Sequence, residues 1–467
     1  MGESAEAGMR WAISDKQRMQ RTQRRVLAAT SLSYVVVILD TSIVNVALER
    51  ISGALTTDIA GLQWVVNAYI LSFASLLLTG GTLADRYGAR NVYLAGLAVF
   101  TLASAWCGLA NELSVLIMAR VLQGCGAALL LPASLSLIKH AFPDTGERAA
   151  AIGIWAGCGG AAMAAGPLAG GILIHLFDWR SIFLANLPFG LLGIWLTWRI
   201  GRNYNPAQAR RLDLGGQCTA ILALGALIAV LIEGPVMGWR SLPILAGMVL
   251  SIGAGSIFLA LQSRRTDAML PLSFFRNGAF SGSALVSMVS ALTFYGLVFV
   301  LSLYFQQVQG YSPLRTGLAF LPLTALVTAG SMVSNRMVQS YGPRRLVSAA
   351  LACYAIGFLG LLASISTAMP SYWLMVLPMP AIGFAAGLIT PAATAALMAA
   401  VEPERAGVAA GVLNSARQTG AALGVAVFGG LITAVHPFRA GLHIALWASA
   451  ALALAAALVW RRASKVD

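Results

Sequence analysis

Charged residues are scarce in this chain. Only 10% of its 467 residues are Asp, Glu, Lys or Arg, and only 17 of them are acidic. A soluble domain of ordinary composition carries about 25% charged residues, so this scarcity argues against a water-soluble protein. The five cysteines stand singly without a CxxC pair, and the four histidines form no pair at i and i+4. We therefore expect neither a disulfide framework nor a structural metal site.

Motifs that carry chemistry in enzymes are missing as well. The chain has no HExxH, no GxSxG and no phosphate-binding glycine loop followed by lysine. A membrane-embedded enzyme would need a converging nucleophile, base or set of metal ligands, so we expect no catalytic residue and no cofactor. A sensor with a transporter-like body is a further alternative, but no soluble signalling domain supports it.

Apolar residues dominate instead, at 58% of the chain. Apolar stretches of about twenty residues, long enough to cross a bilayer as helices, recur from roughly residue 26 to residue 461 with short polar links between them. The pattern predicts an all-α polytopic membrane protein with fourteen helices. The predicted spans are 26–48, 62–84, 91–110, 113–139, 148–176, 181–199, 212–232, 242–262, 279–308, 315–337, 345–366, 372–398, 406–435 and 439–460.

The net charge of +14 could suggest a nucleic-acid partner, but the basic residues follow the sides of the membrane and form no groove-lining cluster. Most of the 31 Lys and Arg fall on the side of the N-terminus. Those predicted on the other side are Arg50, Arg180, Arg240, Arg315 and Arg439, and those within the membrane are Arg120 and Arg417. This bias predicts a cell-membrane protein with both termini in the cytoplasm, in contact with lipid and not with nucleic acid.

Two sequence patterns return later in the chain at a nearly constant distance. Tyr87-Gly88-Ala89-Arg90 is echoed by Tyr341-Gly342-Pro343-Arg344, and the series Gly124, Pro132, Glu147-Arg148-Ala149 by Gly383, Pro391, Glu404-Arg405-Ala406. The repetition predicts a duplicated bundle with parallel copies. The expected organisation is a tail (1–25), a six-helix bundle (26–199), a linker with two extra transmembrane helices (200–278), a second six-helix bundle (279–460) and a short tail (461–467). The extra pair is expected to pack facing lipid, without a transport role.

Asp40 is the first residue to explain, because it places a carboxyl group near mid-membrane in the first predicted span. A carboxylate there is costly unless it has a partner or binds a proton, so it is a natural site for loading and unloading a proton. Arg120, in the fourth span, cannot lose its charge and needs a carboxylate, carbonyls or water. We expect Asp40 and Arg120 to act on each other. The alternatives are a carboxyl held by nearby hydroxyls such as Thr41 or Ser42, and an arginine tied to helix-end carbonyls.

Four stretches give the chain a family resemblance: 39–48 (LDTSIVNVAL), 81–90 (GTLADRYGAR), 120–126 (RVLQGCG) and 157–171, which ends in GPLAGG. On these motifs it resembles the major facilitator superfamily, and within it the fourteen-helix drug:proton antiporters, the multidrug and antibiotic-resistance exporters. A weaker match runs from Trp179 through Asn186. The resemblance implies two six-helix bundles plus two linker helices, and proton-coupled export of amphipathic small molecules. The alternative is a symporter that imports a nutrient or a small acid with protons.

The resemblance also implies roles for two sets of residues. The loop between the second and third spans would form a latch that closes the cytoplasmic side against the helix starting near Ala406, after Glu402, Glu404 and Arg405. Its latch residues are Gly81, Asp85, Arg86, Gly88 and Arg90. Close packing of the fifth span, which marks antiporters, would depend on Gly166, Pro167, Gly170 and Gly171.

Substrate is expected at mid-membrane between the bundles. Depth alone selects the candidate cavity residues Asn45, Asn67, Tyr69, Tyr295, Tyr304, Gln306, Asn414 and Arg417. Arg417 has no obvious acid in its own half, so it either stabilises an anionic or polar substrate or is satisfied by carbonyls. The proton is the expected coupling ion, and the protein is expected to be a monomer.

Overall fold

The computed structural model describes residues 2–200, 212–265, 268–367, 371–402 and 405–464, with side chains from Met19 onward. All regular secondary structure in these ranges is helical. The N-terminal half comprises α1 (Gly2–Leu55), α2 (Ile59–Tyr87), α3 (Ala89–Gly108), α4 (Leu113–Ala141), α5 (Thr145–Leu176), α6 (Ser181–Leu184) and α7 (Asn186–Trp198). Two further helices follow, α8 (Leu214–Met237) and α9 (Leu242–Arg264).

The C-terminal half repeats this arrangement with more interruptions. It comprises η1 (Leu272–Arg276), α10 (Gly278–Leu303) with its π-helical end η2 (Tyr304–Val308), α11 (Pro313–Ala319), α12 (Leu321–Ile365), α13 (Tyr372–Val376), α14 (Met379–Ala399), α15 (Ala406–Ala434) and α16 (Phe438–Ala463). The first helix is longer than the predicted span, because it continues from residue 26 back through the predicted tail.

The described ranges cross the membrane fourteen times. Twelve of their helices are long and apolar enough to span it. One of these, α12, contains two passes, because the backbone of Gly342 (φ 75°, ψ 154°) interrupts the helix just before Pro343. The 29-residue α15 is not among these twelve but is long enough to span, and counting it gives fourteen passes. The predicted all-helical membrane fold is confirmed.

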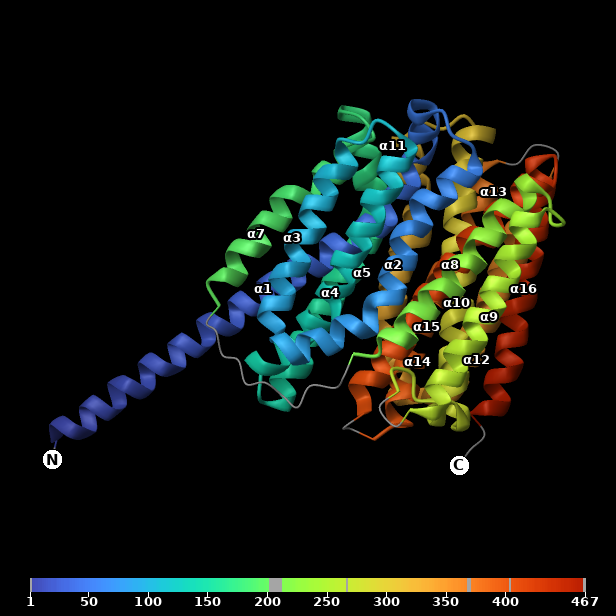
Figure 1. Ribbon diagram of the computed structural model, residues 1–467. Helices are drawn as coiled ribbons and strands as arrows, with labels where there is room; N and C mark the ends of the chain where they lie inside the picture. The colour runs from blue at the N-terminus through green and yellow to red at the C-terminus, as the bar shows by residue number, and fades with distance from the viewer. Residues whose placement is uncertain (1, 201–211, 266–267, 368–370, 403–404, 465–467) are drawn as a thin grey trace.

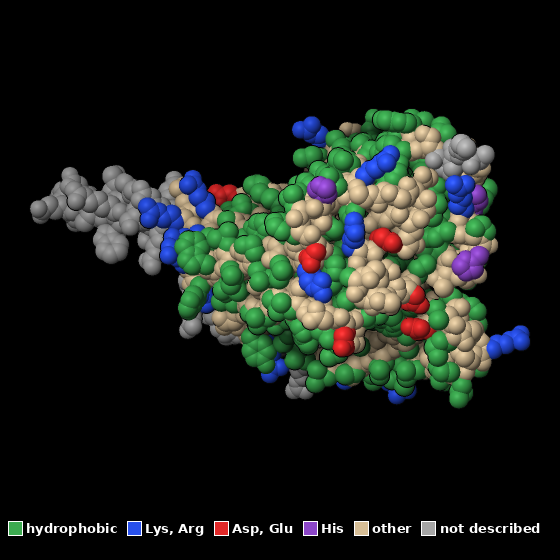
Figure 2. All heavy atoms as spheres, turned by 90° about the horizontal axis from the view of Figure 1, so that it is seen from above, with side chains coloured by type: hydrophobic (Ala, Val, Ile, Leu, Met, Phe, Trp, Pro, Cys, Tyr) green, Lys and Arg blue, Asp and Glu red, His purple; other side chains and the backbone are tan. Residues whose placement is uncertain are grey.

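The helices lie roughly side by side, and the chain begins and ends at the same end of the bundle, the lower end in Figure 1. We call this the terminal end and the opposite one the far end. Seen onto the far end, hydrophobic side chains cover much of the surface, and the charged ones are few and occur singly or in small groups (Figure 2). Large apolar side chains such as Leu242 (80% exposed) and Trp198 (73%) point outward. An apolar flank of this kind suits contact with lipid.

The predicted duplication is visible in matching turns of the two halves. Gly88 between α2 and α3 has φ 87°, and Gly342 within α12 has φ 75°, a left-handed backbone that favours glycine. The arginine two residues after each glycine ties back to the last helix of its own half. Arg90 donates to the carbonyl of Trp198 at 3.0 Å, and Arg344 donates to a carbonyl near the end of α16 at 3.3 Å. The two halves thus share the same turn and the same arginine-to-carbonyl hydrogen bond.

The extra helices α8 and α9 lie against the side of the bundle, where α8 packs on both α2 and α15. Polar bonds attach α8 to α2. Gln217 accepts from the Thr79 hydroxyl at 2.6 Å and donates to the Ser75 carbonyl at 2.7 Å, and the Trp64 indole donates to Glu233 at 2.8 Å. Most of α9 is exposed, in the position expected for a lipid-facing helix. The pair therefore covers the line where α2 meets α15.

Candidate functional site

Asp40, in the membrane-spanning part of α1, is fully buried and held by three side chains. Arg120 Nη1 lies 2.5 Å from its Oδ2. Gln123 Nε2 and Asn186 Nδ2 donate to its Oδ1 at 2.8 and 3.0 Å. Both oxygens accept hydrogen bonds and one contacts a cation, so the carboxyl group is fully bonded within the protein.

Arg120 is buried as completely as its partner, with 1% of its surface exposed. Its Nε donates to the Val65 carbonyl of α2 at 3.1 Å, and its Nη1 also donates to Gln123 at 2.7 Å. The guanidinium carbon lies 4.3 Å from the ring centroid of Tyr69, also on α2, within the range of a cation–π contact. The ion pair therefore connects α1, α2, α4 and, through Asn186, α7.

The structure brings together the two residues that the sequence singled out. The alternative of a carboxyl held by neighbouring hydroxyls finds no support. Thr41 donates to the Val37 carbonyl at 2.9 Å and Ser42 to a carbonyl of its own helix at 3.1 Å. The alternative for Arg120 describes part of its surroundings, since one of its bonds goes to a backbone carbonyl. A role for the pair in proton coupling stays a prediction.

Sequence reasoning missed three other residues of this site: Gln123, Asn186 and Ser104. The Ser104 hydroxyl accepts from Gln123 at 2.9 Å and from Asn186 at 3.4 Å, so it fixes the two amides that face Asp40. Two signals were available. Gln123 lies one helical turn after Arg120, and Asn186 belongs to the weaker motif match. Ser104 has no comparable signal, because one serine in an apolar helix is ordinary.

The eight predicted cavity residues divide into two groups by exposure. The buried group consists of Asn45, Asn67, Tyr69, Tyr304 and Gln306, and the partly exposed group of Tyr295, Asn414 and Arg417. Members of the buried group are engaged in packing. Asn45 donates to a carbonyl of its own helix at 3.2 Å, and the Tyr304 hydroxyl accepts from Gln309 at 3.0 Å. The partly exposed group is the one that a molecule could reach in this conformation.

Arg417 has one hydrogen-bond partner in this partly exposed group. Its Nη2 donates to Asn414 Oδ1 at 2.7 Å, one turn earlier on α15. In the described ranges no carboxylate lies within ion-pairing distance of it. Two residues earlier on α15, Ser415 donates to the Ala74 carbonyl of α2 at 3.4 Å. The hydroxyls of Tyr34 on α1 and Tyr295 on α10 lie within electrostatic range of the guanidinium. Arg417 thus lies where the two halves meet.

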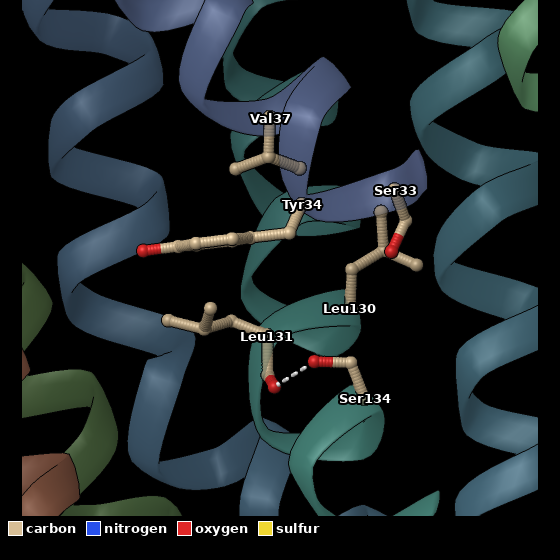
Figure 3. Close-up of a pocket in the computed structure, with 6 residues that line it drawn as sticks. All are labelled: Ser33, Tyr34, Val37, Leu130, Leu131 and Ser134. Carbon is tan, nitrogen blue, oxygen red and sulfur yellow. Dashed lines mark hydrogen bonds between the residues drawn. The ribbon is translucent and has the colours of Figure 1, made fainter. Parts of the chain in front are cut away.

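Tyr34, which the sequence did not single out, forms the N-terminal side of this meeting point. Its ring stacks on Trp155 of α5, with centroids 3.8 Å apart and planes 15° from parallel. The ring fits there because residue 159 is glycine. A Cβ on Gly159 would lie 2.0 Å from a ring atom of Tyr34. Figure 3 shows Tyr34 extending between Val37 and Leu131 along a crevice too narrow to hold a water molecule.

The small residues of α5 pack against both halves. A Cβ on Gly166 would meet the Ser42 hydroxyl at 1.7 Å, and one on Gly170 would meet Ile43 at 2.6 Å, both on α1. A Cβ on Gly171 would lie 2.8 Å from the backbone of α11 in the other half. Pro167 lies within the same helix, and its carbonyl is close to α11. The close approach expected for this motif is present, and its role in preventing proton leakage stays a prediction.

Hydrogen bonds join the two halves at the far end and at mid-membrane. Gln63 of α2 donates to two successive carbonyls of α15, both at 2.8 Å. Ser302 of α10 donates to the Asn45 carbonyl at 2.5 Å, and Thr324 of α12 donates to a carbonyl of α5 at 3.2 Å. Each of these bonds runs from a side chain to a backbone carbonyl. Water can replace such a donor when the halves separate.

The predicted latch loop lies at the terminal end. Gly81 faces the side chain of Pro132 at ordinary contact distance, and Asp85 and Arg86 lie in the last turns of α2. Gly88 supplies the turn into α3, and Arg90 is bound to carbonyls at the end of α7.

The predicted partner of this loop lies at the start of α15. Glu402 pairs with Arg405 there at 3.7 Å, while Glu404 lies outside the described residues. A latch between the halves stays a prediction.

Two six-helix halves with a shared local design, a seam between them and a buried acid–arginine pair inside one of them define a membrane transporter with two pseudo-symmetric halves. A family model described as Major Facilitator Superfamily matches residues 30–425, and again 283–467. The chain belongs to the major facilitator superfamily. This membership confirms the expectation of a transporter and not an enzyme.

Individual relatives agree with this assignment. The chain is 37% identical over 436 residues to the methylenomycin A resistance protein of Bacillus subtilis, with 93% of each chain covered. It is 33% identical to the tetracenomycin C resistance and export protein of Streptomyces glaucescens, over 87% of this chain and 75% of that one. A solved bacterial homologue of the human lysosomal transporter Spinster, in an inward-facing conformation, shares the fold. Its TM-score is 0.69 at 18% identity, with 95% of this chain and 97% of that one covered.

Proposed function

We propose that this protein is a proton-coupled exporter of amphipathic small molecules that works by alternating access. The relatives named for methylenomycin A resistance and for tetracenomycin C resistance and export support an antibiotic-like substrate. The observation that carries the coupling is the setting of Asp40, a carboxylate buried in a membrane-spanning helix and held by three donors. A carboxyl group that is paired when charged and tolerable when neutral can take up and release a proton.

The contacts of Arg120 supply a route from the proton to the seam between the halves. Protonation of Asp40 removes the charge that holds Arg120. Arg120 donates to the Val65 carbonyl and lies over the Tyr69 ring, so a movement of Arg120 changes its contacts with α2. The same helix is joined to α15 through Gln63. The charge state of Asp40 thereby biases the packing of α2 against α15.

The cycle then has two ligands that share two conformations. In the outward-open state Asp40 is protonated from outside and the substrate leaves. The neutral carboxyl lets the protein close and reopen inward, where loss of the proton accompanies uptake of the next substrate molecule from the cytoplasm or the inner leaflet. Exchange follows because each ligand binds in the conformation from which the other departs.

We further propose that the protein is a monomer in the cell membrane with the terminal end in the cytoplasm, as the distribution of Lys and Arg supports. The loop 81–90 would then act on the cytoplasmic side as a latch on the outward-open state. Asp85 and Arg86 would engage the start of α15 in that state. The bonds from Arg90 to α7 would keep the loop moving with its own half.

The test uses purified protein in liposomes with an imposed pH gradient, with methylenomycin A and tetracenomycin C as substrates and a pH-sensitive dye in the lumen. We expect the gradient to drive substrate against the direction of proton flow. Asp40→Asn should abolish this coupled transport, because the amide keeps the volume but cannot ionise, and size-exclusion chromatography checks that the variant folds. Gradient-driven transport at the normal rate by this variant would refute the assignment of Asp40. Protons that move with the substrate would identify a symporter.

A matched control is available on the neighbouring helix. Asp58 caps α2 at the far end by accepting from the Gly61 amide at 2.9 Å. Asparagine caps helices as well as aspartate does, so Asp58→Asn removes a negative charge without removing the cap. This variant should transport like the unsubstituted protein. A loss equal to that of Asp40→Asn would mean that the assay reports a general effect of lost charge.

A further inference from the structure

We propose that the region around Arg417 binds amphipathic acids, molecules that carry a carboxylate or a similar anionic group on an apolar body. This inference rests on the proposed export function and names the substrate class of that function. It follows from an imbalance of charge at the meeting point of the two halves, where a cation from one half faces aromatic side chains of both.

Arg417 is a cation deep in the membrane without an anion. It lies roughly eleven residues into α15, about 16 Å along the helix. Its one hydrogen bond goes to the neutral Asn414, and in the described part of the chain no acid pairs with it. An arginine at this depth is retained where it faces water or a partner, because an uncompensated charge there is costly. The guanidinium is partly exposed, so a ligand can reach it.

Several hydrogen-bond donors lie in this region besides Arg417. The hydroxyls of Tyr34 and Tyr295 lie within reach of its charge, one from each half. The indole nitrogen of Trp155, whose ring stacks on Tyr34, is buried and has no hydrogen-bond partner. A buried N–H without an acceptor is unusual and costs free energy. A bound anion with several acceptor oxygens would suit this set of donors.

The acid that could have attracted a cationic substrate is already occupied. Asp40 has no exposed surface, and both of its oxygens are bonded within the N-terminal half. A positively charged molecule would therefore meet Arg417 and gain no ion pair in return. An anion would gain a charge-assisted hydrogen bond, and a planar guanidinium matches a carboxylate in shape as well as in charge.

The walls beside Arg417 fit an apolar body. The rings of Tyr34 and Trp155 stack on each other, and Val37 and Leu131 line the narrow crevice, too small for a water molecule, along which Tyr34 extends (Figure 3). Rings of this kind hold flat apolar molecules through contact area. The arrangement combines one anion-binding point with an aromatic surface, which is the complement of an amphipathic acid.

The experiment compares three ligands that share a naphthyl ring and differ in charge: naphthylacetic acid, naphthylacetamide and naphthylmethylamine. Binding to the full-length protein in nanodiscs is measured by titration calorimetry, with the signal of empty nanodiscs subtracted. We expect the acid to bind at least about tenfold more tightly than the amide, and the amine to bind most weakly. Arg417→Gln should remove the preference, and Arg417→Lys should keep much of it.

Several results would overturn the inference: an amine that binds as tightly as the acid, an acid preference that persists in Arg417→Gln, or no binding of the acid at millimolar concentration. Arg240→Gln serves as the control, because Arg240 is exposed in the link between α8 and α9 and should leave the preference unchanged. Arg417→Lys shows whether a loss of binding comes from the lost charge or from any change at this position. Size-exclusion chromatography of each variant monitors folding.

Failure of this inference and failure of the proposed function give different results. Calorimetry needs no proton gradient, so Asp40→Asn should retain the preference for the acid even though its coupled transport is lost. The unsubstituted protein could bind the acid through Arg417 and yet show no gradient-driven transport. That result would refute the proposed export function, while the inferred ligand class would stand. Gradient-driven export of the amide and the amine in preference to the acid would refute the ligand class and leave the exporter.

Discussion

The two halves of the molecule each place one arginine deep in the membrane, and they satisfy it differently. Arg120 in the N-terminal half is 1% exposed and has a carboxylate, an amide, a carbonyl and an aromatic ring as partners. Arg417 in the C-terminal half is partly exposed and has a single amide. The first arrangement is complete without a ligand and can be disturbed only by a proton on Asp40. The second is incomplete until something binds.

This contrast separates two tasks that an exchanger must connect. The proton is handled where the protein supplies both charges, and the substrate where it supplies one. A cation at the substrate site favours anions there, while the internal ion pair keeps Asp40 from competing for the same ligand. Substitution of one arginine, or of a residue beside it, tests whether the two sites differ in this way.

The largest difference is expected in stability. Arg120→Ala leaves the Asp40 carboxylate buried without its cation, which typically costs about 3–5 kcal/mol. Arg417→Ala removes a charge that has no counter-charge, so its effect should stay within about 1 kcal/mol. Unfolding of both variants in mixed micelles with increasing denaturing detergent measures the difference. The contrast fails if the two variants lose similar stability.

A double variant tests the physical cause of this loss. Asp40→Ala combined with Arg120→Ala leaves no buried charge, so it should be more stable than Arg120→Ala alone. If the double variant is instead less stable by the sum of the two single losses, packing and not charge accounts for the effect.

The next effect concerns the membrane potential. A proton that enters while an anion leaves moves positive charge inward in both steps, and each elementary charge contributes about 2.3 kcal/mol per 100 mV. A potential that is negative on the side of the terminal end should therefore accelerate export of naphthylacetic acid more than export of naphthylacetamide. Liposomes with a potassium diffusion potential and no pH gradient measure this. Equal responses of the two compounds would contradict an anionic substrate.

A smaller change is expected from loss of one donor to Asp40. Asn186→Ala removes a hydrogen bond to a buried carboxylate, which typically costs about 1–3 kcal/mol. Because this donor holds one oxygen of Asp40 in place, coupled transport should be slower than in the unsubstituted protein. The initial rate of gradient-driven transport at saturating substrate measures the loss, and size-exclusion chromatography monitors folding. An unchanged rate would show that Asn186 does not contribute to coupling.

Sequence reasoning reached one of these arginine sites more fully than the other. Asp40 and Arg120 are conspicuous because charges are rare in apolar spans, and an acid and a base at similar depth predict each other. Gln123 and Ser104 are not conspicuous, because their importance comes from the direction in which each helix faces. The fold followed from the lengths of the apolar spans and from the repeat, which do not depend on that direction.

The substrate side was harder to predict for the same reason. Depth alone selected Arg417, Asn414 and Tyr295, which are partly exposed, but it also selected residues that the structure buries, such as Asn67 and Tyr304. It passed over Tyr34 and Trp155, since an aromatic residue in an apolar span is ordinary. Helix rotation is set by packing between helices distant in sequence, which one sequence does not reveal.

The smallest expected effect comes from a matched pair of glycines on α5. A Cβ on Gly159 would lie 2.0 Å from the Tyr34 ring, whereas one on Gly157 would meet nothing within 4 Å. Gly159→Ala should push Tyr34 off Trp155 and weaken binding of naphthylacetic acid several-fold, since an aromatic pair contributes about 1 kcal/mol. Gly157→Ala should leave binding unchanged and favour the helix slightly.

The same pair tests whether the substrate and proton sites are physically separate. Neither glycine contacts Asp40 or Arg120, so both variants should keep the unsubstituted protein's rate of coupled transport at saturating substrate. If Gly159→Ala slows that transport as strongly as Asn186→Ala does, Tyr34 belongs to the proton site as well. The proton site and the substrate site would then share aromatic side chains and would not be separate.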